Sequence, residues 1–93
     1  MATTIWKVAL GPGMVAYDLP KGAHVLSAAM QLGAPQMWFM CDPEQPREKR
    51  YLFLTGTGHE FPEHGGTLHF ISTMLTEDQA FVFHLFEAKD TVL

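Results

Sequence analysis

Several features that define common protein classes are scarce in this chain. A single cysteine, Cys41, stands among the 93 residues, which excludes an internal disulfide and a cysteine-rich zinc site. Six basic residues stand against ten acidic ones, giving a formal charge of −4. Proteins that bind DNA or RNA normally carry a basic surface, so we expect no nucleic-acid polymer as a partner.

Long apolar runs are also lacking. No run approaches the roughly 18 residues that are needed to span a bilayer, and no secretory signal is recognised at the start of the sequence. We therefore expect a cytoplasmic protein that does not enter a membrane.

Apolar residues, by contrast, are plentiful for so short a chain. They make up 47 % of the sequence and include seven Phe, two Tyr, two Trp and six Met. The length fits one domain, residues 1–93, with an ordered core over about 3–88. A domain of this size buries only about 60 % of its unfolded surface. Either its core is dense, or part of its apolar surface is covered by a second copy of the chain.

The spacing of eight glycines and six prolines favours many short strands over long helices. Residues 27–31 have fair helix propensity, but Gly22 and Gly33 bracket only ten residues, so a strand is predicted there as well. The expected fold is all-β, a compact small sandwich or barrel of six to seven short strands. The predicted strands are 3–10, 14–19, 23–31, 36–41, 49–55, 67–75 and 80–87.

Two of these strands are apolar on both faces. Residues 36–41 are expected to form a central strand. Residues 80–87 place Phe81, Phe83 and Leu85 on one face and Val82, His84 and Phe86 on the other. Such a strand is either central in a two-layer sandwich or covered by another subunit, and we expect a homo-oligomer.

The histidines give little indication of catalysis. His59 and His64 are separated by five residues with Pro62 between them, so they do not form the helical His-Glu-x-x-His zinc motif. A metal site of His59, His64 and His69 is geometrically possible, but loop histidines that bond to backbone and water are favoured. His24, His69 and His84 receive no functional role.

No credible nucleophile is present either. Cys41 ends an apolar strand, where a thiol is usually buried and inert. Ser27 and Ser72 lack the Gly-x-Ser-x-Gly turn of serine hydrolases. We therefore expect a protein that is not an enzyme, with no catalytic residues, no metal and no cofactor.

A ligand site has better support. Arg47, Lys49 and Arg50 are three of the six basic residues and lie within four positions. They could bind phosphate, or they could form a solvated charged turn with Glu44 and Glu48. The following Gly-Thr-Gly-His segment, with Thr57, Gly58 and His59, offers backbone N–H groups that an anion could approach.

Either tryptophan could stack on a base, although most tryptophans of small domains are core residues. Stacking on an aromatic side chain contributes roughly 1–3 kcal/mol per base. The basic cluster, the glycine-rich segment and Trp38 or Trp6 together suit a small nucleotide better than a polymer. Which tryptophan is exposed stays open at this point.

The same residues resemble those of a family of small, mostly phage-encoded proteins of about this length. The likeness covers residues 3–87, and its most specific parts are the segments at 56–60 and 81–84. The segments that carry it are Thr-Ile-Trp-Lys at 4–7, Leu-Pro-Lys-Gly-Ala at 19–23, Leu-Ser at 26–27, Trp38, Asp-Pro at 42–43, Glu-Lys-Arg at 48–50, Gly-Thr-Gly-His-Glu at 56–60, Phe-Ile-Ser-Thr at 70–73 and Phe-Val-Phe-His-Leu-Phe-Glu at 81–87.

This resemblance implies a phage immune-evasion protein, a sponge that binds cyclic-oligonucleotide signals of bacterial antiphage defence such as CBASS without cleaving them. It implies a homo-oligomer, with a tetramer favoured, and ligand pockets between subunits in the host cytoplasm. The implied ligand is a cyclic dinucleotide such as 3′3′-cGAMP.

Carried over residue by residue, the resemblance assigns the ligand site. It implies that Lys49 and Arg50, in the cluster with Arg47, contact phosphates. Trp38 would stack on a base, and Thr57, Gly58 and His59 would line the pocket. Arg50→Ala is then expected to weaken nucleotide capture without unfolding the protein.

Two other functions stay open. One is a hydrolase of the signal that uses His59 and Glu60. The other is a protein-binding inhibitor of a host factor that attaches through an exposed strand edge or an aromatic patch.

Overall fold

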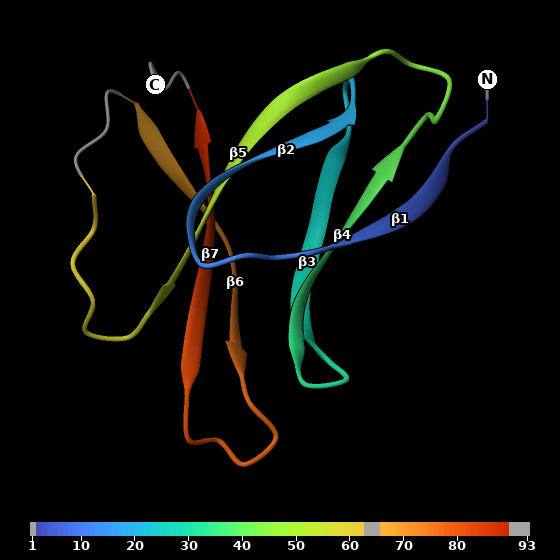
Figure 1. Ribbon diagram of the computed structural model, residues 1–93. Coiled ribbons are helices and arrows are strands. Elements are labelled where there is room, and N and C mark those ends of the chain that lie inside the picture. Colours follow the sequence, from blue (N-terminus) through green and yellow to red (C-terminus); the bar gives the residue numbers. More distant parts are fainter. Residues whose placement is uncertain (1, 63–65, 90–93) are drawn as a thin grey trace.

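Seven strands and no helix make up the part of the chain that the computed structural model describes, residues 2–62 and 66–89 (Figure 1). All seven predicted strands are present, with ends that differ from prediction by no more than two residues. The segment with fair helix propensity is a strand, as predicted. The strands are β1 (Thr4–Ala9), β2 (Gly13–Pro20), β3 (His24–Gln31), β4 (Ala34–Cys41), β5 (Arg47–Gly56), β6 (Thr67–Leu75) and β7 (Val82–Lys89).

The strands form two antiparallel sheets, so of the two predicted architectures the chain adopts the sandwich. One sheet has the order β1-β4-β3 and the other β2-β5-β7-β6. We call them the three-stranded and the four-stranded sheet. The predicted central position of residues 36–41 is confirmed, because β4 lies between β1 and β3. β3 of one sheet lies beside β6 of the other. The Ser72 hydroxyl on β6 donates a hydrogen bond to the carbonyl oxygen of Ala28 on β3 at 2.9 Å.

The core lies between the sheets because alternate side chains of a pleated strand point to the same face. On β4, Met37 and Phe39 point inward, and they meet Leu52 of β5 and Leu85 of β7 from the other sheet. Burying an apolar side chain of this size stabilises the fold by roughly 1.5–3 kcal/mol. Because these residues come from both sheets, neither sheet holds a core of its own.

The opposite face of the four-stranded sheet carries an aromatic cluster. Phe53 of β5, Phe86 of β7 and Phe70 of β6 stand in register across three strands. Phe61, from the segment after β5, packs edge-on against Phe53 and Phe86 with ring centroids 5.4 and 5.3 Å apart. Phe61 and Phe70 remain 52 % and 60 % exposed. The sandwich thus explains one apolar face of β7, while its other face is only partly covered.

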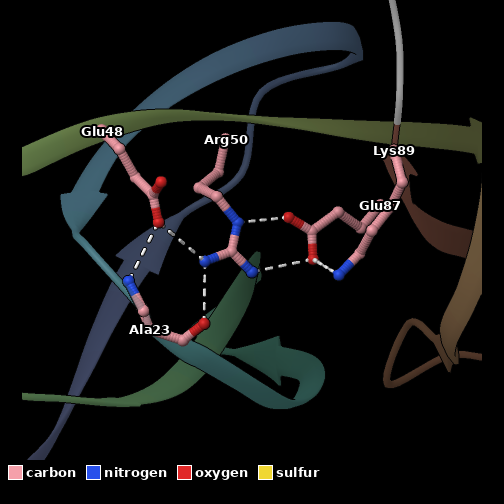
Figure 2. Close-up of polar contacts among 6 residues, drawn as sticks. Ala23, Glu48, Arg50, Glu87 and Lys89 are labelled. Carbon is pink, nitrogen blue, oxygen red and sulfur yellow. Dashed lines mark hydrogen bonds and ion pairs between the residues drawn. The ribbon is translucent and has the colours of Figure 1, made fainter.

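A buried ion pair joins the strands at one end of the sandwich (Figure 2). Arg50 of β5 donates from Nε to Glu87 Oε2 at 2.5 Å and from Nη2 to Oε1 at 3.0 Å. Its Nη1 donates to the carbonyl oxygen of Ala23 at 2.8 Å, just before β3. The two charged side chains are only 15 % and 7 % exposed. One guanidinium therefore ties β5 to β7 and the four-stranded sheet to the start of β3.

The Arg50 guanidinium stays positively charged at ordinary pH. The hydrogen bonds to Glu87 raise the pKa of Arg50 above its ordinary value, and this effect outweighs the opposite effect of burial. A group whose pKa is raised on folding stabilises the folded state below its unfolded pKa and loses that effect only as the pH rises through the folded pKa. For an arginine that window lies far above neutral pH, so Arg50 stays charged wherever the protein is handled.

The turn between β3 and β4 contains an unfavourable residue. Leu32 and Gly33 link the paired residues Gln31 and Ala34, and both have positive φ, 52° and 79°. A two-residue hairpin turn of this kind prefers Asn-Gly, because Asn tolerates the left-handed conformation and Leu does not. Leu32 is also 97 % exposed, so its side chain contributes almost no packing in return.

We expect Arg50→Ala to lower the free energy of unfolding by about 3 kcal/mol, because the buried Glu87 carboxylate then keeps only the half-exposed Lys89 ammonium, 3.8 Å away, as a cation. This prediction differs from the expectation, drawn from the sequence, that the substitution would leave the fold intact. Chemical denaturation monitored by circular dichroism measures the change. Replacing both members, Arg50→Met with Glu87→Leu, should recover most of the loss.

The matched control is Lys49→Ala, one residue earlier on β5. Lys49 pairs with Asp18 at 2.8 Å, but both side chains are 61 % exposed, and exposed pairs contribute about 0–1 kcal/mol. Equal stability losses for Lys49→Ala and Arg50→Ala would contradict the structural role of Arg50.

We expect Leu32→Asn to raise the free energy of unfolding by about 1 kcal/mol, since it removes the cost of a β-hairpin turn with Leu at positive φ. The same denaturation experiment measures it. Leu26→Asn, at an exposed position of β3 where φ is not positive, should give no gain, and an equal gain there would refute the explanation by turn strain.

Candidate functional site

A cleft lies where the end of β5 meets the beginning of β7. Its volume is about 490 Å³, within the usual range of roughly 300–1,000 Å³ for small-molecule sites. The turn after β5 is fixed against β7 by a hydrogen bond from the Thr57 N–H to the Val82 carbonyl oxygen at 3.2 Å. The lining residues are Gly56, Thr57, His59, Ala80, Phe81, Val82 and Phe83.

Glycine is required at two positions of this turn. Gly58 has a φ of 86°, in the left-handed region that side chains rarely adopt. Gly56 lies beneath the ring of His59, and a Cβ added there would come within 3.1 Å of the ring. The Gly-Thr-Gly-His segment therefore folds so that the His59 imidazole lies close to Gly56, and both residues line the cleft.

Two hydrogen bonds link the side chain of Thr57 through His84 to β6. Its hydroxyl lies 2.7 Å from Nε2 of His84, and Nδ1 of His84 lies 3.0 Å from the hydroxyl of Thr73 on β6. A neutral imidazole donates through one nitrogen and accepts through the other. His84 therefore fixes the side chain of Thr57 and couples it to β6.

The sequence did not reveal part of this site. Phe81 and Phe83 form its apolar wall, and His84, which was expected to have no role, holds Thr57. The only sequence signal was that residues 80–87 are apolar on both faces. The cleft combines an aromatic wall with a hydroxyl and an imidazole at its rim, an arrangement that can hold a flat polar ring.

The basic residues predicted to bind phosphate do not line this cleft. Arg47 lies over the ring of Trp6, 5.5 Å from its centroid, and donates hydrogen bonds to the carbonyl oxygens of Pro43 and Gln45. Lys49 is bound to Asp18, whose hydrogen bond raises the pKa of the Lys49 ammonium. With Arg50 bound to Glu87, each of the three cations already has a partner on its own chain.

The predicted ligand residues fall into two groups, the basic cluster and the Gly-Thr-Gly-His segment, which lie far apart along β5. Arg50 and Gly56 stand six positions apart on one strand, roughly 20 Å at the rise of an extended chain. The structure thus brings Thr57, Gly58 and His59 together but leaves Arg47, Lys49 and Arg50 at a distance. Within one protomer these residues do not form a single site.

Trp38 lies elsewhere again. On β4 it alternates with the buried Met37 and Phe39, so it is placed on the outer face of the three-stranded sheet and is partly buried. Trp6, on β1, is 38 % exposed and packs edge-on against Phe39. Neither tryptophan lines the cleft.

A smaller pocket of about 260 Å³ opens beside the buried ion pair. It contains Arg50 and Lys89 but also the carboxylate of Glu87, and Lys89 lies 3.8 Å from that carboxylate. Its lining thus has two cations and one carboxylate, and a second carboxylate, that of Glu48, lies 3.7 Å from Arg50. Its lining residues are Ala23, His24, Val25, Arg50, His69, Ile71, Glu87 and Lys89.

Metal and thiol chemistry gain no support from the described residues. Within 2–62 and 66–89, no group of three His, Cys, Asp or Glu side chains is placed to hold a metal ion. His64, one member of the conceivable trio, lies outside that part of the chain. Cys41 is buried, as predicted, and is a free thiol. Among the described residues no helix is long and apolar enough to cross a membrane.

Comparison with known proteins identifies the family but not an activity. No curated protein and no solved structure matches the chain significantly. Residues 1–92 match a family described as a domain of unknown function, DUF7352. Since the match extends over nearly the whole sequence, the chain belongs to the DUF7352 family.

Proposed function

We propose that this protein binds a small cyclic nucleotide in the cleft between the β5 turn and the start of β7, and that it holds the ligand without cleaving it. The observation that carries the proposal is a cleft that Phe81 and Phe83 line together with Thr57 and His59. The resemblance of the sequence to phage sponges suggests the ligand class, a cyclic dinucleotide such as 3′3′-cGAMP. The setting would be the cytoplasm of an infected bacterium.

In this proposal a base lies against the aromatic wall. Stacking on such a wall contributes roughly 1–3 kcal/mol per base. Thr57 and His59 then form hydrogen bonds to the edge of the base, and His84 keeps the Thr57 hydroxyl oriented. A site built for a polar edge discriminates against bases that leave its groups unpaired.

The phosphates of the proposed ligand would bind best to Lys or Arg side chains, which the cleft lacks. None of its lining residues is Lys or Arg, while Lys49 is exposed on β5 of the same sheet. A ligand that contacts both the cleft and basic side chains would therefore lie between protomers. The partly covered cluster of Phe53, Phe61, Phe70 and Phe86 supports such self-association, and the proposed assembly is a homo-oligomer, with a tetramer favoured.

The mechanism would be mass action. A protein that binds the signal more tightly than the host effector, and outnumbers it, removes the signal from the free pool. Nanomolar binding corresponds to about −12 kcal/mol. No bond needs to break, so the proposal requires no nucleophile and no metal.

Incubation of the purified protein with a panel of cyclic di- and trinucleotides should remove one of them from the free pool. Heat denaturation should then release that nucleotide intact, as chromatography of the supernatant would show. A degraded nucleotide would instead favour a hydrolase, and loss of the degradation in His59→Gln or Glu60→Gln would assign it to these two residues. Failure to capture any nucleotide would favour a protein partner.

Thr57→Val should weaken capture about 2- to 13-fold, because one hydrogen bond contributes about 0.5–1.5 kcal/mol. Phe81→Ala should weaken it by a further stacking contribution of roughly 1–3 kcal/mol. Isothermal titration measures both. Thr67→Val, at an exposed position on β6, is the matched control, and equal losses in Thr57→Val and Thr67→Val would exclude the cleft as the site.

A further inference from the structure

The four strand edges of the sandwich are not equally protected. An edge strand presents free backbone N–H and C=O groups that can pair with another strand, and natural sheets blunt such edges with bulges, prolines, charges or covering segments. The edges here are β1 and β3 in one sheet and β2 and β6 in the other. Comparing them shows which edge is open to a partner.

Three of the edges carry protection. Both β3 and β6 have a bulge, between Val25 and Ser27 and between Phe70 and Ser72, and these two strands lie against each other. β2 begins with Gly13 and ends with Pro20, and Pro cannot donate to a neighbouring strand. These features oppose the addition of a further strand to β2, β3 or β6.

β1 has neither a bulge nor a proline, and Lys7 is its only charged side chain. It runs Thr-Ile-Trp-Lys-Val-Ala without a bulge, and within residues 2–62 and 66–89 its only strand partner is β4. Five of its six residues are exposed, and Ile5 is 56 % exposed. A regular, exposed edge strand of this composition is prone to pair with another chain.

We propose that β1 pairs antiparallel with β1 of a second copy, which joins two three-stranded sheets into one six-stranded sheet across a twofold axis. This inference rests on the self-association included in the proposed function, but not on nucleotide binding. A second copy is the favoured occupant because the strand is complementary to itself in one register.

Two constraints select that register. Opposed residues of antiparallel strands share a face, so inward Trp6 must oppose an inward residue and outward Ile5 an outward one. Of the long overlaps that satisfy this, one sets Lys7 directly against its own copy, and like charges in that position are destabilising. The other sets Trp6 against Trp6 and Ile5 against Lys7 of the second copy, without a charge conflict.

This pairing also changes the outer face of the sheet. Lys7 stands opposite Trp38 on β4 within each protomer, so the second copy contributes its own Lys7 and Trp38 to the same continuous face. A Lys–Trp pair that is isolated on one protomer is then repeated about the twofold axis. In the isolated protomer the Lys7 ammonium donates to Gln31 Oε1 at 2.5 Å, an exposed contact that costs little to exchange.

The test uses the charge at position 5 without any nucleotide. Ile5→Lys places like charges in both Ile5–Lys7 pairs, and Ile5→Glu places opposite charges there. We expect Ile5→Lys to weaken one step of self-association about tenfold relative to Ile5→Glu, the effect of two cross-strand pairs. Adding Lys7→Glu to Ile5→Lys should restore association. Sedimentation equilibrium measures the dissociation constants.

Leu26→Lys and Leu26→Glu are the matched controls, since Leu26 is exposed on β3, away from the proposed interface, and these two should associate equally. Thermal unfolding shows whether each variant is folded. A wild-type protein that stays monomeric at every concentration would overturn the inference, as would equal dissociation constants for Ile5→Lys and Ile5→Glu. Because no ligand is present, either result is distinguishable from a failure of nucleotide capture.

Discussion

The ion pair of Arg50 and Glu87 is the interaction on which the arrangement of the sandwich most depends. Each sheet alone is too small to bury an apolar core, and the guanidinium adds a polar connection from β5 and β7 to the carbonyl oxygen of Ala23 at the entrance to β3. Burying two charges is favourable only when both are fully paired. The same requirement makes Arg50 unavailable as a free phosphate ligand, because its hydrogen bonds are committed to the fold.

The interactions that hold the two sheets together lie within the strands, whereas the candidate ligand site lies where strands end. The cleft is formed where β5 runs into a glycine-rich turn and β7 begins, and its rim residues come from segments that do not hold the core. Rigid sheets that carry functional groups on their connecting loops are a common arrangement. Here Thr57 belongs to the turn, while His84, which orients it, belongs to a core strand, so loop and scaffold are coupled at that point.

The sequence predicted the parts of this fold that depend on neighbours in the chain. Glycine and proline spacing located all seven strands, and the two apolar faces of residues 36–41 predicted the central position of β4. It could not predict the partner of Arg50, because Glu87 lies 37 positions away and nothing local links them. The basic cluster therefore resembled a phosphate site, and the wall of Phe81 and Phe83 was not recognised. Thr57 and His59, which the sequence suggested as ligand residues, both line the cleft because one short turn holds them.

Apolar content and the composition of the candidate site both favour the proposed self-association. The aromatic cluster on the four-stranded sheet, the exposed residues of β1 and a cleft without basic residues are each unfavourable or incomplete in an isolated protomer. A second copy can cover the exposed residues, and in the proposed assembly its Lys49, whose pair with Asp18 is exposed, would be the cation most readily available to the cleft. For a chain of this length, in which a single core stabilises only marginally, association also adds the buried area that the protomer lacks. Self-association would thus serve the stability of the fold and the completeness of the site together.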